Sequence, residues 1–531
     1  MSKSEGTHLI RAVLGDPEFK NIDLISESST CDYFRIRLDP ERFHGIPDEW
    51  ILLTTKVGHR SADVVISELA QASTEVSSKE AIMIVSNSPD LVFDDAFSGA
   101  RNVIALDHRD LAGYDRKSRV PAQASPLAHG IRRRLPKAAA LMPALTLYQG
   151  AEPVEGWRFV GRARELQRIV SSNESLMLIG PRRMGKTSLL RQAAKLLREQ
   201  GDEVFFLDVQ DLKTPGEVVR LLVREYDEAR EKSIWRRIGE FDEKPLDWVL
   251  RRLASRSKPP VVIFDELGNV IDSAQKDNWN FFGTLRKYIH SGEVRIVTSC
   301  FQEVYLAQQA NFSGPLVNFS NEMLLNPLSE GDAQKLVIDP WRFWNPIDQH
   351  ELKEVRKLLA RDVGTHPLFL QFLGKSLLEQ MQDDSRPSVL VALKHVLRKE
   401  LYRYFRVPMK GFFYNIVDPV PKYLFLRRCQ QARADKQLLG DAVITEEWVD
   451  DELKGLGLES RTQSRDNMLV SMEFYGFISP KQDSPHEYAI AVPLAYRYIE
   501  KVSNPIERLI DSLASEVRSV GSKYHLKELP R

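Results

Sequence analysis

A glycine-rich segment between Gly180 and Thr187 is the first place in the chain where residue types and spacing indicate chemistry. It reads Gly-x-x-x-x-Gly-Lys-Thr and stands between an apolar run and a helical pattern. Glycines let backbone N–H groups converge on phosphate oxygens, and the following helix directs its positive end at the same charge. We predict that Lys186 reaches the β- and γ-phosphates of a nucleotide and that the Thr187 hydroxyl binds Mg²⁺. The residues expected around the phosphates are Gly180, Pro181, Arg182, Arg183, Met184, Gly185, Lys186, Thr187 and Ser188.

An acidic pair downstream could complete this chemistry. Val261 to Phe264 form a β-branched and aromatic run typical of a buried parallel strand, and Asp265 and Glu266 follow it directly. A carboxylate at a strand end beside a phosphate loop can hold the magnesium, and a second can orient the attacking water. We therefore assign Asp265 to magnesium and Glu266 to the general base.

Five strand-like runs alternate with helical patterns around these motifs, between about residues 158 and 328. They are Leu176 to Ile179, Val204 to Leu207, Val261 to Phe264, Val294 to Thr298 and Met323 to Leu325. Such alternation predicts a parallel sheet covered by helices on both faces, with ligands at the carboxyl ends of the strands. Gly180, Asp265 and Ser299 all fall at such ends.

Composition limits the function classes. The chain has 531 residues, enough for about three or four domains. Its 74 basic and 74 acidic residues cancel, so a contact with nucleic acid or membrane requires a local patch. The three cysteines have no metal-ligand spacing, and no run is apolar enough to cross a membrane. We expect a cytoplasmic protein without a membrane partner.

Several segments together resemble a known family. "FVGRARELQRI", "GPRRMGKTSLL", "VVIFDE", "NPLSEGDAQKLV" and "GTHPLFLQFLG", in this order, resemble the STAND-type signalling ATPases related to AAA+ proteins, particularly the archaeal-type ATPases. The resemblance covers about Arg158 to Val502. It implies that Gly161 and Arg162 lie near the nucleotide, that Thr298 and Ser299 match the polar sensor of the γ-phosphate, and that Pro367 contacts the nucleotide from a lid.

Two positions depart from the family pattern. Cys300 stands where related switch ATPases often carry an arginine, and the lid reads Gly364-Thr365-His366-Pro367 instead of Gly-Gly-His-Pro. An arginine at the γ-phosphate contributes roughly 10³ to 10⁵ in rate where it operates. We therefore expect slow ATP hydrolysis, unless another arginine (Arg182, Arg183, Arg286 or one from a neighbouring subunit of a homo-oligomer) substitutes.

The flanking blocks have their own patterns. Residues 113–157 are rich in Pro, Ala and Arg, which predicts a basic linker. Residues 329–398 contain leucine-rich helical patterns, and we expect them to form the lid. Residues 399–531 end in a predicted winged helix-turn-helix, with Phe477 to Ser479 and Tyr488 to Val492 as the wing, followed by a tail. DNA could contact the linker or the winged helix, although the acidic helix before the expected recognition helix favours packing against the ATPase.

Residues 1–112 are predicted to form a small α/β domain. Two strand-like runs, "CDYFRIRLD" and "WILLTTK", would place Asp32 opposite Thr54 and near Lys56 if they pair as a hairpin. This order weakly resembles the restriction-endonuclease fold, whose site uses an acidic residue and a lysine, but Thr54 stands where a metal ligand is expected. An active nuclease, a degenerate nuclease-like module and an unrelated sensor or effector domain all remain open, and we expect no efficient cleavage of duplex DNA.

The sequence therefore predicts a multidomain α/β protein that binds ATP and Mg²⁺. Its expected role is a slowly hydrolysing ATP-dependent switch in signalling or defence, in which ATP or ADP changes how the terminal domains pack. Three alternatives remain: an ATP-regulated DNA-binding regulator, a nuclease-ATPase acting on foreign DNA, and a nucleotide-binding scaffold with little turnover.

Overall fold

The computed structural model describes most of the chain from residue 147 onward and separate strands before it. The described residues are 19–27, 31–38, 46–55, 81–85, 93, 103–107, 131, 147–150, 152–228, 245–255, 258–300, 316, 318–344, 347–380, 387–459, 462–481, 484–503, 505–519 and 527–528. They form two compact units. The first comprises residues 1–152, 331–357 and 370–404, and the second comprises 153–330, 358–369 and 405–531.

The first unit contains a five-stranded sheet in the order β1-β2-β3-β4-β5. Its strands are β1 (Phe19–Glu27), β2 (Cys31–Leu38), β3 (Glu49–Thr55), β4 (Ile82–Val85) and β5 (Val103–Leu106). β1, β2 and β3 pair antiparallel, whereas β3, β4 and β5 pair parallel. The two hairpin runs predict β2 and β3, and the apolar runs "AIMIVSN" and "NVIALDHRDL" predict β4 and β5. β1 is missed, because polar residues interrupt its apolar positions.

The described residues of the first unit from residue 331 onward are mostly helical. The helices are α12 (Glu330–Trp344), α13 (Gln349–Asp362), α14 (Pro367–Glu379) and α15 (Val389–His395), followed by a π-helical turn, η6 (Val396–Glu400), and α16 (Leu401–Met409). Parts of α13, α14 and α16 belong to the second unit. Tyr148 packs against α14, where a Cβ on Gly374 would lie only 2.0 Å from the Tyr148 ring.

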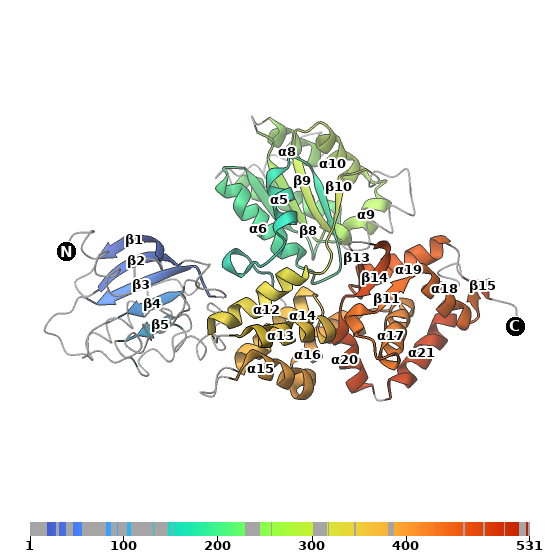
Figure 1. Ribbon diagram of the computed structural model, residues 1–531. Helices are drawn as coiled ribbons and strands as arrows, with labels where there is room; N and C mark the ends of the chain where they lie inside the picture. The colour runs from blue at the N-terminus through green and yellow to red at the C-terminus, as the bar shows by residue number, and fades with distance from the viewer. Residues whose placement is uncertain are drawn as a thin grey trace. The chain divides into compact units, whose positions relative to one another are not determined.

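The second unit is built around a parallel sheet in the order β10-β6-β9-β8-β7 (Figure 1). This confirms the predicted α/β class. The strands are β6 (Leu176–Ile179), β7 (Val204–Asp208), β8 (Val261–Asp265), β9 (Arg295–Cys300) and β10 (Asn321–Leu324). β9 extends two residues beyond its predicted end because Ser299 and Cys300 still pair with Leu178 and Ile179 of β6.

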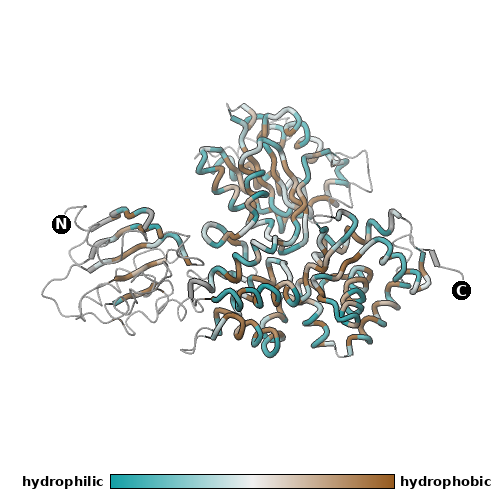
Figure 2. Tube along the Cα trace, in the orientation of Figure 1, coloured by the Kyte–Doolittle hydropathy of each residue, from teal (hydrophilic) through white to brown (hydrophobic). Residues whose placement is uncertain are grey.

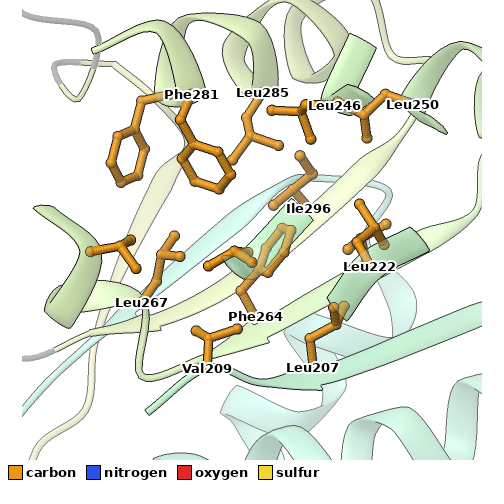
Figure 3. Packing of buried hydrophobic residues seen from close by; sticks show 14 of the residues in the cluster. Leu207, Val209, Leu222, Leu246, Leu250, Phe264, Leu267, Phe281, Leu285 and Ile296 are labelled. Atoms are coloured by element: carbon orange, nitrogen blue, oxygen red, sulfur yellow. The ribbon is translucent and has the colours of Figure 1, made fainter. Parts of the chain in front are cut away.

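Helices cover both faces of this sheet. One apolar cluster joins the strands to α5 (Ala163–Ser171) and α6 (Lys186–Glu199). The other face packs against α7 (Pro215–Glu228), α8 (Pro245–Ala254) and α10 (Asn280–His290). Figure 3 shows Phe264 and Ile296 facing Leu246, Phe281 and Leu285 in this second cluster. The hydrophobic colouring of the strands in Figure 2 follows from burial on both faces.

The C-terminal part of the second unit is mostly helical with a small antiparallel sheet. Its helices are α17 (Pro419–Ala434), α18 (Glu446–Gly455), α19 (Thr462–Phe474), α20 (Pro493–Val502) and α21 (Ile506–Ser519). The sheet has the order β11-β14-β13, from Val443–Thr445, Ser484–Ile490 and Ile478–Lys481. The two later strands lie close to the expected wing, and β11 is an additional strand. None of the described helices is long and apolar enough to cross a membrane.

Candidate active site

The Gly180–Thr187 loop joins β6 to α6 as a tight turn. α6 begins at Lys186, and the residue before it, Gly185, has a φ of 90°. Gly180 is required for a different reason, because a Cβ there would lie 2.9 Å from the Leu325 carbonyl oxygen. Arg183 adopts a left-handed φ of 63°, which is strained for a residue with a side chain. The loop therefore stands at the carboxyl end of β6 with the amino end of α6 directed at it.

Lys186 is buried within its own loop. Its Nζ donates to the carbonyl oxygens of Gly180 and Pro181, at 3.0 Å each. The same Nζ lies 3.7 Å from Oε1 of Glu266, and the Lys186 side chain is only 3% exposed. The ammonium group thus lies at the base of the turn, and a nucleotide phosphate would have to compete with these carbonyl oxygens for it.

The acidic strand end lies beside this lysine. Ser299 of β9 donates its hydroxyl to Asp265 Oδ1 at 2.5 Å and accepts the backbone N–H of Glu266 at 2.8 Å. Burial raises the pKa of Asp265, and the carboxylates of Glu266 and Asp208 add to this, while hydrogen bonds from Ser299 and Thr187 oppose it. Ser299 therefore fixes the positions of both acidic residues.

Glu266 has an unusual backbone. It is in the left-handed region with a φ of 60°, directly after the last residue of β8. Non-glycine residues in this region cost about 1–3 kcal/mol and occur often at functional sites. The conformation turns its side chain toward Lys186, and the carboxylate remains 26% exposed.

Thr298 and Ser299 lie on opposite faces of β9. Ser299 faces the acidic pair, whereas its neighbour alternates to the face that carries Ile296 and Cys300. Among the described residues, the buried Thr298 hydroxyl has no hydrogen-bond partner. Ser299 is therefore the one of the two polar residues that meets the site.

The segment before α5 lies against the start of α6. The backbone N–H of Val154 donates to Ser188 Oγ at 3.0 Å, and that of Gly156 donates to Gln192 at 2.8 Å. Arg162 is 6% exposed and donates from Nη2 to the Met184 carbonyl oxygen at 3.3 Å. Gly161 has a φ of 81°, so this turn also needs a glycine.

Residues 364–367 reach the loop from a distant part of the chain. Pro367 is the first residue of α14, and His366 before it is fully buried. Neither His366 ring nitrogen has a hydrogen-bond partner among the described residues. Burial, together with the positive charges of Arg162 and Arg183, lowers the pKa of His366 to about 3, so the ring is neutral.

The apex of the loop meets C-terminal residues at what we term the loop junction, formed by Arg183, Met184, His366, Gly411 and Gly476. A Cβ on Gly411, in the π-helical turn η7 (Lys410–Tyr414), would lie 2.9 Å from the Arg183 guanidinium. A Cβ on Gly476 would lie 3.3 Å from His366 and 3.5 Å from Met184. Two C-terminal glycines therefore give the loop apex and His366 room to approach.

Aromatic rings extend the loop junction into the C-terminal part. His366 lies 5.1 Å from Phe412, and Phe412 lies 5.4 Å from Phe477, measured between ring centroids. Phe477 stacks on Phe425 of α17 at 4.6 Å. Sequence reasoning missed this arrangement, since the only local signals are a glycine before a strand in "FYGFIS" and the histidine of "GTHP".

The helix α19 is the recognition helix of the predicted winged helix-turn-helix, and residues near both of its ends contact other protein residues. Arg465 is paired with Glu446 at 2.7 Å and with Asp450 at 2.6 Å. Phe474 at its other end is 5% exposed and belongs to the apolar cluster between the parallel sheet and α7, α8 and α10. Both ends of α19 therefore face other parts of the same unit.

Two residues of the possible N-terminal site lie opposite each other on adjacent strands of the first unit's sheet. Asp32 of β2 is the register partner of Thr54 of β3, as the hairpin pattern predicts. Lys56 lies outside the described residues. No group of three acidic, histidine or cysteine side chains that could hold a metal occurs among the described residues.

Comparisons with known proteins agree with the loop and the sheet. Residues 159–336 match the sequence model of a family described as an ATPase domain predominantly from Archaea. This part of the chain, about a third of it, is therefore a P-loop ATPase domain of the archaeal type. No curated protein is significantly similar in sequence to the chain.

The similarities to solved structures are weaker than the match to the family model. The Walker-type ATPase PABY2304 of Pyrococcus abyssi is 16% identical with a TM-score of 0.43, over 67% of this chain and all of that chain. The Aeropyrum pernix ORC1 protein, solved in complex with DNA, is 14% identical with a TM-score of 0.32, over 68% and 96%. The Thermotoga maritima RuvB Holliday junction branch migration motor is 12% identical with a TM-score of 0.31, over 66% and 99%. At these TM-scores the likenesses support no inference about function.

Proposed function

We propose that the protein is an ATP-dependent molecular switch of the STAND type that hydrolyses ATP slowly. In this proposal, the nucleotide state of the Gly180–Thr187 loop changes the packing of residues 405–531, in a signalling or defence role. The observation that carries the proposal is the loop junction, in which the apex of a phosphate loop contacts C-terminal residues directly.

Nucleotide binding has a physical route to this junction. Lys186 now bonds to two carbonyl oxygens of its own loop, and phosphate oxygens would draw its Nζ out of that position. We expect competition between the phosphate and these carbonyl oxygens for Lys186 to shift the loop backbone between Pro181 and Gly185. Arg183 and Met184 lie within that stretch, and a Cβ added to Gly411 or Gly476 would meet them, so we expect the adjustment to reach the C-terminal part.

The residues fit ATP with Mg²⁺. Thr187 and Asp265 would supply one hydroxyl and one carboxylate ligand, which is the sparse protein contribution typical of magnesium at phosphate sites. Glu266, partly exposed and held by Ser299 through its backbone, is suited to orient the attacking water. Magnesium would neutralise charge on the phosphates when it is bound.

The existing contacts of two arginines near the loop support slow ATP turnover. Arg183 is engaged at Gly411, and Arg162 is bonded to the Met184 carbonyl, so using either at the γ-phosphate means giving up an existing contact. Cys300 stands at the end of β9, where related proteins often place an arginine, and it is 1% exposed among apolar residues. We therefore assign neither Arg162 nor Arg183 to that role.

Two substitutions test the enzymatic part. Lys186→Ala removes the phosphate-binding ammonium group and should abolish ATP binding or turnover. Glu266→Gln should preserve ATP binding and reduce phosphate release by roughly 100-fold or more, as expected for losing a positioned general base. Lys195→Ala, an exposed lysine on the same helix, is the matched control and should behave like the parent. Equal ATP affinity and turnover in Lys186→Ala and the parent would contradict the proposal.

A further inference from the structure

A cavity of about 810 Å³ lies at the amino ends of the strands of the parallel sheet. β8, β9 and β10 begin in its wall, at Val261, Arg295 and Asn321. β8 ends at Asp265 of the candidate active site, so about 13 Å of strand separate the cavity from that site. Pockets for small molecules have volumes of about 300–1,000 Å³, and this cavity falls within that range. We call it the amino-end cavity.

Arg295 is the buried cation in the wall of the amino-end cavity. It is 6% exposed, and its guanidinium donates from Nε to the Glu174 carbonyl oxygen at 2.8 Å and from Nη2 to the Ile169 carbonyl oxygen. A guanidinium has five N–H donors and keeps its charge in proteins. The two bonds therefore hold the side chain near the end of α5 and leave three donors without a hydrogen-bond partner in the described part of the chain.

The charge of Arg295 has no carboxylate of its own. Burial lowers the pKa of Arg295, and the carboxylates of Asp202 and Glu174 raise it from a distance. Asp202 forms an ion pair with Lys258, and Glu174 lies 3.6 Å from Arg168, so within the described ranges neither is paired with Arg295. Buried charges in proteins are normally paired, because removing them from water is costly. The amino-end cavity therefore contains a positive charge that an anion would balance.

The rest of the wall can hydrogen-bond a polar ligand. Ser320 lines the cavity, and its buried hydroxyl has no hydrogen-bond partner among the described residues. The exposed side chains of Asn173, Asn318 and Asn321 line the cavity as well. Hydroxyl and amide groups both donate and accept, so they match the hydroxyl groups of a ligand.

We propose that the amino-end cavity binds a small hydroxylated organic anion, with its oxyanion at Arg295 and its polar body against Ser320 and the asparagines. A phosphate monoester and a carboxylate offer the same charge-assisted hydrogen bonds to a guanidinium. The site uses no residue of the phosphate loop or the loop junction, so it goes beyond the switch function and can be tested apart from it.

Isothermal titration calorimetry tests the cavity in the full-length Lys186→Ala variant, which lacks the phosphate-binding ammonium group of the loop. Ribose 5-phosphate, gluconate and uncharged ribose are compared, so that a phosphate and a carboxylate are distinguished. We expect at least one of the two anions to bind saturably. Ribose should bind at least roughly 10-fold more weakly, because it lacks the charged group that Arg295 would hold.

Asn321→Asp, made in the same background, adds a negative charge to the cavity wall and keeps the bonds of Arg295. It should weaken binding of the anion roughly 5-fold or more by repulsion. The matched control is Asn280→Asp, the same change at the exposed first residue of α10. That residue is about 15 Å along the helix from His290 in the cavity wall, so the control should bind like the Lys186→Ala protein.

Arg295→Gln removes the charge itself and should abolish binding of the anion. Its thermal unfolding midpoint is measured beside it, because the substitution also removes two bonds at the end of α5; if this variant does not fold, Asn321→Asp decides. No saturable binding of either anion, equal affinity for ribose, or anion binding retained by folded Arg295→Gln would each overturn the proposal. Equal effects of Asn321→Asp and Asn280→Asp would overturn it as well.

Discussion

Gly364 supports the loop junction through a contact that leaves no room for a side chain. It follows α13 with a φ of 86°, and its N–H donates to the Leu359 carbonyl oxygen at 2.9 Å. A Cβ at this position would lie 2.2 Å from the Ala491 carbonyl oxygen and 2.7 Å from Pro493 Cδ. Thr365, next in the chain, donates its N–H to Ala491 at 3.3 Å, so the two backbone segments are joined at the same place.

Gly364→Ala should therefore destabilise the second unit. A left-handed backbone costs a residue with a Cβ about 1–2 kcal/mol, and overpacking adds about 1–3 kcal/mol. A total of about 2–5 kcal/mol should lower the unfolding midpoint by at least roughly 4 °C. Because the contact with residues 491–493 must open, His366 should also lose its burial beside Gly476.

The assay is thermal unfolding of the full-length variant beside Gly283→Ala. Gly283 lies in α10, and a Cβ there meets nothing within 4 Å. That control should match the parent or gain up to about 1 kcal/mol, since alanine favours a helix over glycine. A midpoint for Gly364→Ala that equals or exceeds the parent's would show that this position tolerates a side chain.

Two further predictions concern Glu473 and Ser299. Burial raises the pKa of Glu473 to about 7 from an ordinary 4.5, so the folded protein keeps this proton between those pH values while the unfolded chain loses it. Stability should fall as pH rises from about 4.5 to 7, and Glu473→Gln should be more stable than the parent at pH 8 by up to about 3 kcal/mol but nearly equal to it at pH 5. Denaturant unfolding at both pH values checks this, and an equal difference at the two would contradict it. Ser299→Ala leaves Asp265 and the Glu266 N–H without their shared partner. It should reduce ATP turnover, measured by phosphate release, roughly 10-fold or more, with less effect on ATP binding, measured by nucleotide titration. Unchanged turnover would mean that Ser299 does not position the acidic residues.

The core of the site could be predicted from sequence because its signals are local. The loop sequence fixes the turn and the start of α6 at Lys186, and an apolar run followed by acidic residues fixes the end of β8 at Asp265. Parallel strands bring their carboxyl ends to one edge, so Ser299 could be expected beside Asp265 without knowledge of the loops. The partner of each strand was harder to foresee, and β1 was missed.

The loop junction could not be predicted in this way. His366 and Gly476 are more than 100 positions apart, and nothing local to either indicates that they meet. Arg183 looks like a phosphate ligand in the loop sequence, yet its guanidinium lies over Gly411 because that residue lacks a side chain. The bonds of Lys186 to its own loop also depend on backbone geometry that residue types do not specify.

Hydrogen exchange of the full-length protein, without nucleotide, with ADP and with a non-hydrolysable ATP analogue, tests the switch most directly. We expect nucleotide to change exchange in peptides covering residues 410–416 and 472–478, which include Gly411 and Gly476, as well as in the loop itself. Lys186→Ala should lose all of these changes together. If nucleotide protects the loop of the parent but leaves both C-terminal peptides unchanged, the protein binds nucleotide without transmitting its state, and the central claim is wrong.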